Sequence, residues 1–326
     1  MTDLGHIIGI DLGTTNSVVA AVENDQPVVL MNSEGSTRTP SVVAFGEDPT
    51  APPMVGELAK RQAVLNPERT IASIKRLMGR SLADIEPWRK DLPYALTEED
   101  GRLMISVGGV GYTPAQISAF ILKKLKETAE VYFGQPVDKA VVAVPAYFDD
   151  LQRQATYEAA ELAGLKVLRL LNEPTAAAMA YGLGRGSEER VAVYDFGGGT
   201  FDLTILDIAG NTFEVLTSVG DTHLGGDDID ALLLERLLAE LRKRAGDEYR
   251  PDALVLQRLR EAAEKAKCEL SYARLATISL PFIGYVEGEP LHLEMTVRRS
   301  ELEEMIRPLV DRSLECCQRA LESCGL

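Results

Sequence analysis

The chain has 326 residues, of which 45% are hydrophobic and 26% charged, so it is long enough for two domains and a sizeable core. Its 34 basic and 50 acidic residues give a net charge of −16, which argues against nucleic acid or anionic membranes as partners. The sequence shows no secretion signal, no membrane-spanning stretch, no Cys-x-x-Cys pair and only three histidines. These features predict a cytoplasmic protein without disulfides, without a zinc site and without histidine-based catalysis.

The first half of the chain is predicted to begin with strands and to continue with alternating strands and helices. Strand-like runs occur at 6–11, 16–22, 27–31 and 41–45. From about 50 to 112 the pattern is irregular, with short helices predicted at 55–65 and 70–78, which indicates a small insertion. A helix then begins at the N-cap residue Thr113 and ends at Gly134. The order strand, helix, strand, helix predicts a partly parallel sheet from the segments 139–144, 149–162, 165–171 and 172–181.

A polar break at 184–189 separates this half from a second half, which we expect to form another lobe. Strand character is found at 191–207, 213–219, 276–284 and 291–297. Helical spacing of apolar residues is found at 227–245, 252–271 and 300–323.

A short pattern of strand, acid and glycine turn occurs once in each half. One strand-like run ends at Asp11 and is followed by Gly13-Thr-Thr15, and another ends at Asp195 and is followed by Gly197-Gly-Gly-Thr200. Backbone N–H groups in such turns bind anions, and an acid beside a bound phosphate requires a cation as well. The duplication therefore indicates two related lobes that present one Mg-nucleotide site to a shared cleft. An ordinary hairpin with a glycine-rich turn is the alternative for either copy.

Six segments, taken in their order and spacing, resemble the nucleotide-binding domain of the DnaK-type seventy-kilodalton heat-shock chaperones. They are Ile10-Asp-Leu-Gly-Thr-Thr-Asn-Ser17, Val144-Pro-Ala-Tyr-Phe148, Asn172-Glu-Pro-Thr-Ala-Ala-Ala178, Asp195-Phe-Gly-Gly-Gly-Thr-Phe-Asp202, Gly220-Asp-Thr-His-Leu-Gly-Gly226 and Glu261-Ala-Ala-Glu-Lys-Ala-Lys267. The resemblance covers essentially the whole chain, which carries neither a P-loop nor a dinucleotide-binding glycine motif.

The resemblance implies an α/β fold, the two-lobed actin-like ATPase with duplicated ribonuclease-H-like cores, in which mixed sheets are flanked by helices. The lobes would span 1–184, with a small inserted subdomain at about 50–112, and 185–326. In the family a final strand, the rest of the adenosine motif and a peptide-binding domain follow this point. We therefore expect a truncated domain with weakened nucleotide affinity, in which lobe II is incomplete and no peptide-binding domain is present.

The resemblance also assigns the phosphate end of the site. Asp11, Asp195 and Asp202 would be the metal residues, with Mg²⁺ held largely through water and K⁺ placed with the help of Asp202. Lys75, Glu173, Asp195 and Thr200 would support slow in-line attack of water on the γ-phosphate. The phosphate grips would be Gly13, Thr14, Thr15, Asn16, Gly197, Gly198, Gly199 and Thr200. From the residues alone, Lys75 could be a solvated helix lysine and Glu173 could be a capping acid. Asp11 and Asp195 could be aspartates that form turns.

The adenosine end is assigned in the same way to Gly226, Asp227, Glu264, Lys267, Cys268 and Ser271. Glu264, Lys267 and Ser271 share one face of a predicted helix, for which a solvated ion-pair face is the alternative. Cys268 stands where some relatives carry arginine, and Asp227 stands where glutamate is usual. Pro145 and Arg153 would relay the nucleotide state to the substrate-binding part of the family's proteins, although Arg153 alone would pass for a surface arginine.

The implied function is the binding of ATP and ADP and slow Mg-dependent hydrolysis in a stress-response chaperone that controls protein folding. The implied partners are a J-domain co-chaperone, which would contact Arg169, Asn172 and Thr175, and a nucleotide exchange factor. Client peptides would bind only through a domain absent from this chain. The alternatives are a non-catalytic module that binds co-chaperones and another actin-fold phosphotransferase such as a sugar kinase.

Overall fold

The protein forms two compact units in a computed structural model that describes residues 6–48, 50–86, 89, 92–181 and 188–326. The first unit contains the chain up to Asp195 together with 202–220 and 320–326, and the second contains 196–201 and 221–319. The lobe boundary expected at 184/185 falls on residues 182–187, which lie outside the described residues, so that boundary remains a prediction.

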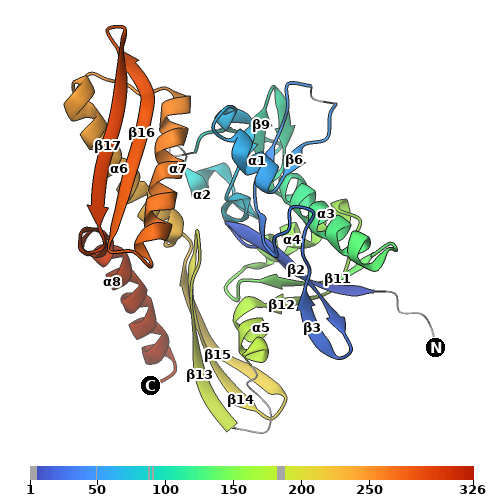
Figure 1. Cartoon of the computed structure of the whole chain (residues 1–326). Coiled ribbons are helices and arrows are strands. Elements are labelled where there is room, and N and C mark those ends of the chain that lie inside the picture. Colours follow the sequence, from blue (N-terminus) through green and yellow to red (C-terminus); the bar gives the residue numbers. More distant parts are fainter. Residues whose placement is uncertain (1–5, 49, 87–88, 90–91, 182–187) are drawn as a thin grey trace. The chain divides into compact units, whose positions relative to one another are not determined.

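The first unit is built on a six-stranded mixed sheet (Figure 1). Its main path runs β12 (Lys166–Asn172), β11 (Lys139–Val144), β1 (Ile7–Asp11), β2 (Asn16–Glu23) and β3 (Gln26–Val29), and β4 (Thr39–Pro40) pairs with β2. β11 pairs with β1 and β12 in parallel, whereas β2 pairs with β1 and β3 in antiparallel. The partly parallel sheet predicted from the order of elements is confirmed.

Three helices connect and cover these strands, namely α3 (Pro114–Phe133), α4 (Asp150–Leu162) and α5 (Glu173–Ala180). α3 begins at the predicted N-cap, where the hydroxyl of Thr113 accepts a hydrogen bond from the N–H of Gln116 at 3.1 Å. It ends at Gly134, whose φ of 66° is the left-handed conformation that closes many helices. Both ends of this helix are therefore determined by short-range interactions.

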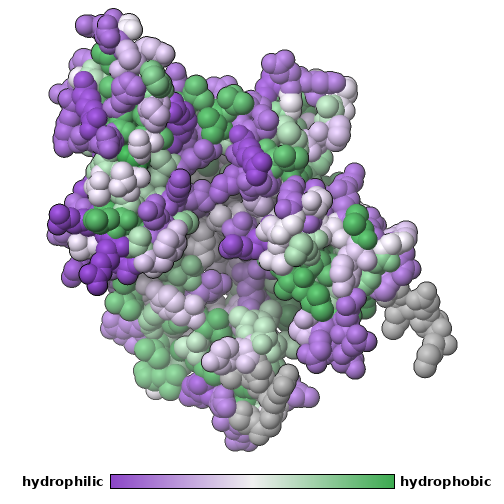
Figure 2. Space-filling view, viewed as in Figure 1, coloured by the Kyte–Doolittle hydropathy of each residue, from purple (hydrophilic) through white to green (hydrophobic). Residues whose placement is uncertain are grey.

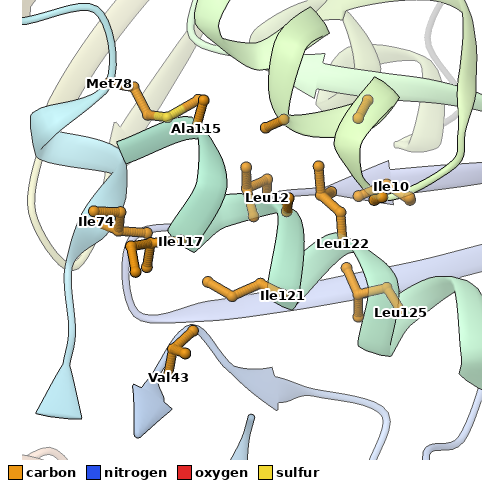
Figure 3. Packing of buried hydrophobic residues seen from close by; sticks show 14 of the residues in the cluster. Ile10, Leu12, Val43, Ile74, Met78, Ala115, Ile117, Ile121, Leu122 and Leu125 are labelled. Carbon is orange, nitrogen blue, oxygen red and sulfur yellow. The ribbon is translucent and has the colours of Figure 1, made fainter. Parts of the chain in front are cut away.

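The core of the first unit includes the buried side chains of β1 and the buried face of α3 (Figure 3). Side chains along β1 alternate between exposed and buried positions, as expected for a strand with one covered face. In Figure 3, Ile10 and the following Leu12 lie beside Ile121, Leu122 and Leu125 of α3. This packing holds the end of β1, and with it the turn that follows Asp11.

The region before α3 carries two small three-stranded sheets. One runs β6 (Met54–Val55), β5 (Val43–Ala44), β7 (Thr70–Ile71), and the other runs β10 (Val110–Tyr112), β9 (Arg102–Val107), β8 (Ala95–Glu99). The helical segments are α1 (Glu57–Gln62), the 3₁₀ turns η1 (Pro67–Arg69) and η2 (Ile74–Leu77), and α2 (Leu82–Ile85). The helix predicted at 70–78 is wrong, because the β-branched pair Thr70 and Ile71 pairs with β5, leaving only η2 as a turn.

A third sheet runs in the order β13 (Glu188–Phe196), β14 (Phe201–Ala209), β15 (Thr212–Asp221). The hairpin predicted at 191–207 is confirmed as β13 and β14. Ala178 of α5 packs with Leu206 and Ile208 of β14, so α5 is anchored by its alanine-rich face. Val191 and Val193 of β13 pack against the same cluster, so α5 lies against both strands of the hairpin.

The second unit contains α6 (Gly226–Ala245), α7 (Ala253–Leu270), β16 (Leu275–Val286), β17 (Glu289–Arg298) and nearly all of α8 (Arg299–Ser323). The strands β16 and β17 form an antiparallel pair that packs with α6 and α7 (Figure 1). Leu233, Leu237 and Leu241 form the buried stripe of α6, at the spacing of one helical face.

The face drawn in Figure 2 carries both hydrophilic and hydrophobic residues. Among the described residues, no helix combines the length and the apolar character needed to cross a bilayer.

Candidate functional site

A buried ion pair lies at the centre of the first unit. The Nζ of Lys75 lies 2.6 Å from the Oε1 of Glu173, and the two side chains are only 9% and 19% exposed. Lys75 is carried by the short turn η2, and Glu173 is the first residue of α5, directly after the parallel strand β12. Pro174 in the first turn of α5 suits this helix start, since its missing N–H would have no partner there.

Two further carboxylates act on this pair. Burial opposes the charge of Lys75, but Glu173, Asp11 and Asp195 together raise its pKa, so the ammonium stays protonated. Burial raises the pKa of Glu173, and the nearby charges of Asp11 and Asp195 raise it further, against the lowering effect of Lys75. Burial likewise raises the pKa of Asp195. One ammonium among three acids leaves an excess of negative charge, which a bound cation would neutralise.

Asp202 lies close to this cluster and is 6% exposed. Its Oδ1 accepts a hydrogen bond from the hydroxyl of Ser218 at 3.0 Å, and it also accepts one from the backbone N–H of Ala146. Burial, opposed by these hydrogen bonds, raises its pKa to about 7, with Glu173 and Asp195 adding to the rise. Its Oδ2 is buried and has no hydrogen-bond partner among the described residues. An unsatisfied carboxylate oxygen at this position could accept a cation.

The donor atoms of this region suit a hard cation. Carboxylate oxygens are provided by Asp11, Asp195 and Asp202, and the buried Oγ1 of Thr15 has no partner in the described part of the chain. Within that same part, no three His, Cys, Asp or Glu side chains form a ready-made metal group. Mg²⁺ fits such a site, because it keeps several waters and takes only one or two protein carboxylates.

The turn after Asp11 is held by a neighbouring loop. A Cβ on Gly13 would overlap the carbonyl oxygen of Asn16, so only glycine fits there. The hydroxyl of Ser41 donates to the carbonyl of Gly13 at 2.8 Å and lies 2.8 Å from the hydroxyl of Ser17. Ser41 could not be identified from the sequence, because nothing in its local pattern links it to a turn 28 residues earlier.

The triple-glycine turn belongs to the second unit and is fixed by the start of α6. The N–H of Gly197 donates to the carbonyl of Thr200 at 2.9 Å, which closes the turn. The N–H of Asp227 donates to the carbonyl of Gly198 at 2.7 Å. A Cβ on Gly225 would lie 2.5 Å from the oxygen of Gly198, so a side chain there would disrupt this contact. The predicted phosphate turn and the predicted residues Gly226 and Asp227 are therefore neighbours in the structure.

A second ion pair supports the start of α6. The Nζ of Lys267 lies 2.6 Å from the Oδ2 of Asp230 and donates to the carbonyl of Gly226 at 3.0 Å. Burial raises the pKa of Asp230 to about 6, although Lys267 acts in the opposite direction. Asp230 was not predicted as a site residue, because its only signal in the sequence is an acid one helical turn after Asp227. Lys267 thus forms an ion pair with α6, and its side chain is 22% exposed.

The remaining predicted adenosine residues lie on α7 or at its end. Cys268 is exposed, and the hydroxyl of Ser271 donates to the carbonyl of Lys267 at 3.4 Å. Glu264 lies one turn before Lys267 and raises the pKa of Asp230. Lys267 on this helix contacts the start of α6 through Gly226 and Asp230.

Arg153 links two segments that lead to the charged cluster. Its Nε donates to the carbonyl of Phe148 at 2.9 Å, and its Nη2 donates to the Oδ1 of Asn172 at 3.1 Å and to the carbonyl of Ala146 at 3.3 Å. Pro145 is buried in the same loop after β11. Arg153 is therefore part-buried, and its hydrogen bonds join the loop after β11 to the end of β12.

Comparison with known families agrees with these features. The mixed sheets flanked by helices are consistent with a fold of the actin-like ATPase type. The family model described as Hsp70 protein matches residues 7–326. The chain belongs to the Hsp70 family, and this membership supports a nucleotide-binding domain of a chaperone ATPase. Proteins of this family bind ATP and ADP and work with co-chaperones.

Proposed function

We propose that this chain binds Mg-ATP and hydrolyses it slowly to ADP and phosphate, as the nucleotide-binding domain of a chaperone that controls protein folding. The observation that carries the proposal is the buried pair of Lys75 and Glu173, surrounded by Asp11 and Asp195. A buried ammonium among acids has little structural value, because its desolvation offsets much of the ion-pair attraction. The same arrangement suits a site that receives a phosphate and a cation.

Each side chain has a separate role in this proposal. Lys75 binds an oxygen of the γ-phosphate and stabilises the charge that develops during transfer. Glu173, next to it, orients the attacking water, and its raised pKa leaves it able to take up a proton. Asp11 and Asp195 would hold Mg²⁺, and the unpartnered Oδ2 of Asp202 would accept K⁺. When bound, Mg²⁺ neutralises phosphate charge and draws the nucleotide to these acids.

The turns supply the remaining contacts in the proposal. The N–H groups of 13–16 and 197–200, with the hydroxyls of Thr14, Thr15 and Thr200, grip the phosphates. The adenosine binds at Gly226, Asp227, Glu264, Lys267, Cys268 and Ser271. The hydrogen bonds of Gly226 and Asp227 to the glycine turn support the assignment of these adenosine residues.

The experiment is the release of phosphate from ATP by the purified chain, with and without Mg²⁺. We expect Lys75→Ala and Asp195→Asn to lower kcat by about 10² to 10³, the loss typical of removing one charge-stabilising group. Lys123→Ala is the matched control, because Lys123 is an exposed lysine on α3. Equal rates in the wild type and in both site variants would refute the proposal, and ADP formation only on addition of a sugar would favour a sugar kinase.

We further propose that J-domain co-chaperones and a nucleotide exchange factor bind this chain, as is general for the family. Arg169 on β12 is exposed, and Asn172 and Thr175 are partly exposed at the end of β12 and the start of α5. The bond from Arg153 to Asn172 would couple that surface to the position of Glu173. Stimulation of phosphate release by a J-domain, lost in Arg169→Ala, is the measurement that tests this contact.

A further inference from the structure

Gly79 lies directly against the backbone of the first turn of α4. A Cβ on Gly79 would be 2.6 Å from the nitrogen of Gln152, 2.7 Å from its Cα and 2.8 Å from the carbonyl carbon of Leu151. These are backbone atoms of a helix, so no side-chain rotation can relieve the overlap. Gly79 also has a φ of +66°, a backbone conformation that residues other than glycine rarely adopt.

The segment that leads to Gly79 carries Lys75 and is held by packing and by a hydrogen bond. Ser73, before η2, has a left-handed φ of 53°, and Met78, after it, accepts a hydrogen bond at its Sδ from the hydroxyl of Ser118 at 3.3 Å. The apolar side chains of this segment are almost fully buried: Ile74, Leu77 and Met78. In Figure 3, Ile74 and Met78 lie beside Ile117 and Ala115 of α3. The buried side chains on both sides of Lys75 therefore tie the position of Lys75 to the packing of this turn.

The first turn of α4 also supports the partner of Lys75. Arg153 in that turn donates to Asn172, the residue immediately before Glu173. The turn itself is closed by a reciprocal cap, in which Gln152 N–H donates to Asp149 Oδ1 at 2.9 Å and Asp149 N–H donates to Gln152 Oε1 at 3.2 Å. The first turn of α4 thus contacts the segment that carries Lys75 and the segment that carries Glu173, although the two residues are 98 positions apart.

We propose that Gly79 is a positioning residue for the ATPase, because its lack of a side chain sets the distance between the Lys75 turn and α4. The inference rests on the proposed function, since it assigns Lys75 to the reaction. A Cβ would have to move by about 0.8 Å to bring the 2.6 Å overlap to an ordinary 3.4 Å contact. A displacement of that size at a reacting group can cost on the order of 10²-fold in rate.

The test compares Gly79→Ala with Gly101→Ala in the full chain. Gly101 has a φ of +73° but nothing within 4 Å of its Cβ, so its variant reproduces the backbone strain without the overlap. We expect Gly79→Ala to lower kcat by roughly 10- to 100-fold while KM for ATP changes less than about threefold, and Gly101→Ala to keep the wild-type kcat. In the double variant Gly79→Ala with Lys75→Ala, kcat should equal that of Lys75→Ala alone, because both act through one ammonium.

The outcomes separate this inference from the proposed function. If Lys75→Ala has no effect on kcat, the proposed function fails. If Lys75→Ala lowers kcat but Gly79→Ala does not, or if the two losses multiply in the double variant, the positioning role of Gly79 is overturned. Should Gly79→Ala not fold, Asp149→Ala loosens the same helical turn from an exposed position. An unchanged kcat in Asp149→Ala, or a loss that multiplies with that of Lys75→Ala, would then overturn it.

Discussion

Replacing Lys75 with methionine removes the ammonium that lies beside Glu173, Asp11 and Asp195 while keeping a side chain of similar length. Glu173 then loses its partner at 2.6 Å, and Asp11 and Asp195 lose the charge that offsets them. An uncompensated buried carboxylate is strongly destabilising, unless it takes up a proton. The rise already present in the pKa of Glu173 indicates that protonation is the route this side chain would take.

The cost of that protonation sets the size of the effect. The ordinary pKa of a glutamate carboxyl is 4.5, so protonating it at pH 7 costs about 2.5 pKa units, which is at most about 3.4 kcal/mol. At pH 5 the same step costs about 0.7 kcal/mol. Since the folded pKa of Glu173 lies above its unfolded value, the variant is most stable at low pH and loses stability as the pH rises. The deficit of Lys75→Met should therefore grow from below 1 to about 3 kcal/mol between pH 5 and pH 7.

Urea unfolding of the wild type and Lys75→Met, without nucleotide and with EDTA, measures this deficit at both pH values. Lys123→Met is the control, because it removes an exposed lysine from α3 and should stay within about 0.5 kcal/mol of the wild type at either pH. The double variant Lys75→Met with Glu173→Gln should recover most of the loss at pH 7. A pH-independent deficit, or a double variant as unstable as Lys75→Met, would refute the electrostatic account.

Three further predictions concern other elements. As the pH rises through about 6, the free energy of unfolding of Asp230→Asn should rise relative to that of the wild type by on the order of 2 kcal/mol. The reason is that a carboxyl with a raised folded pKa loses its favourable contribution to stability in that range. The exposed Asp247→Asn is the control, and parallel pH profiles for the wild type and Asp230→Asn would contradict this prediction. Gly225→Ala should cost about 1–3 kcal/mol in urea unfolding, because its Cβ would meet the oxygen of Gly198, and a neutral result would show that the glycine turn can move freely. Thr113→Ala should cost about 1 kcal/mol by loss of the α3 cap, with Thr113→Ser retaining it, whereas equal losses in both would point to a different cause.

Several features follow from the sequence alone because their causes are short-range. The ends of α3 are set by Thr113, Pro114 and Gly134, whose capping and left-handed preferences act within a few residues. The hairpin at β13 and β14 and the mixed order of strands were predicted from local patterns as well. The ordered motifs also identified the family before any contact was known, and the match over residues 7–326 confirmed it.

The tertiary structure decided which polar groups matter, and it did so through burial and long-range contacts. By its local pattern Lys75 could be a solvated lysine, and only packing places it beside Glu173, 98 residues away. Asp230 and Ser41 carry no motif and became visible only by what they touch. The strand at 70–71 required β5 as a partner, which helical periodicity could not reveal. Capping and turn formation are local properties of a peptide, whereas desolvation and ion pairing depend on which distant segments exclude water from a side chain.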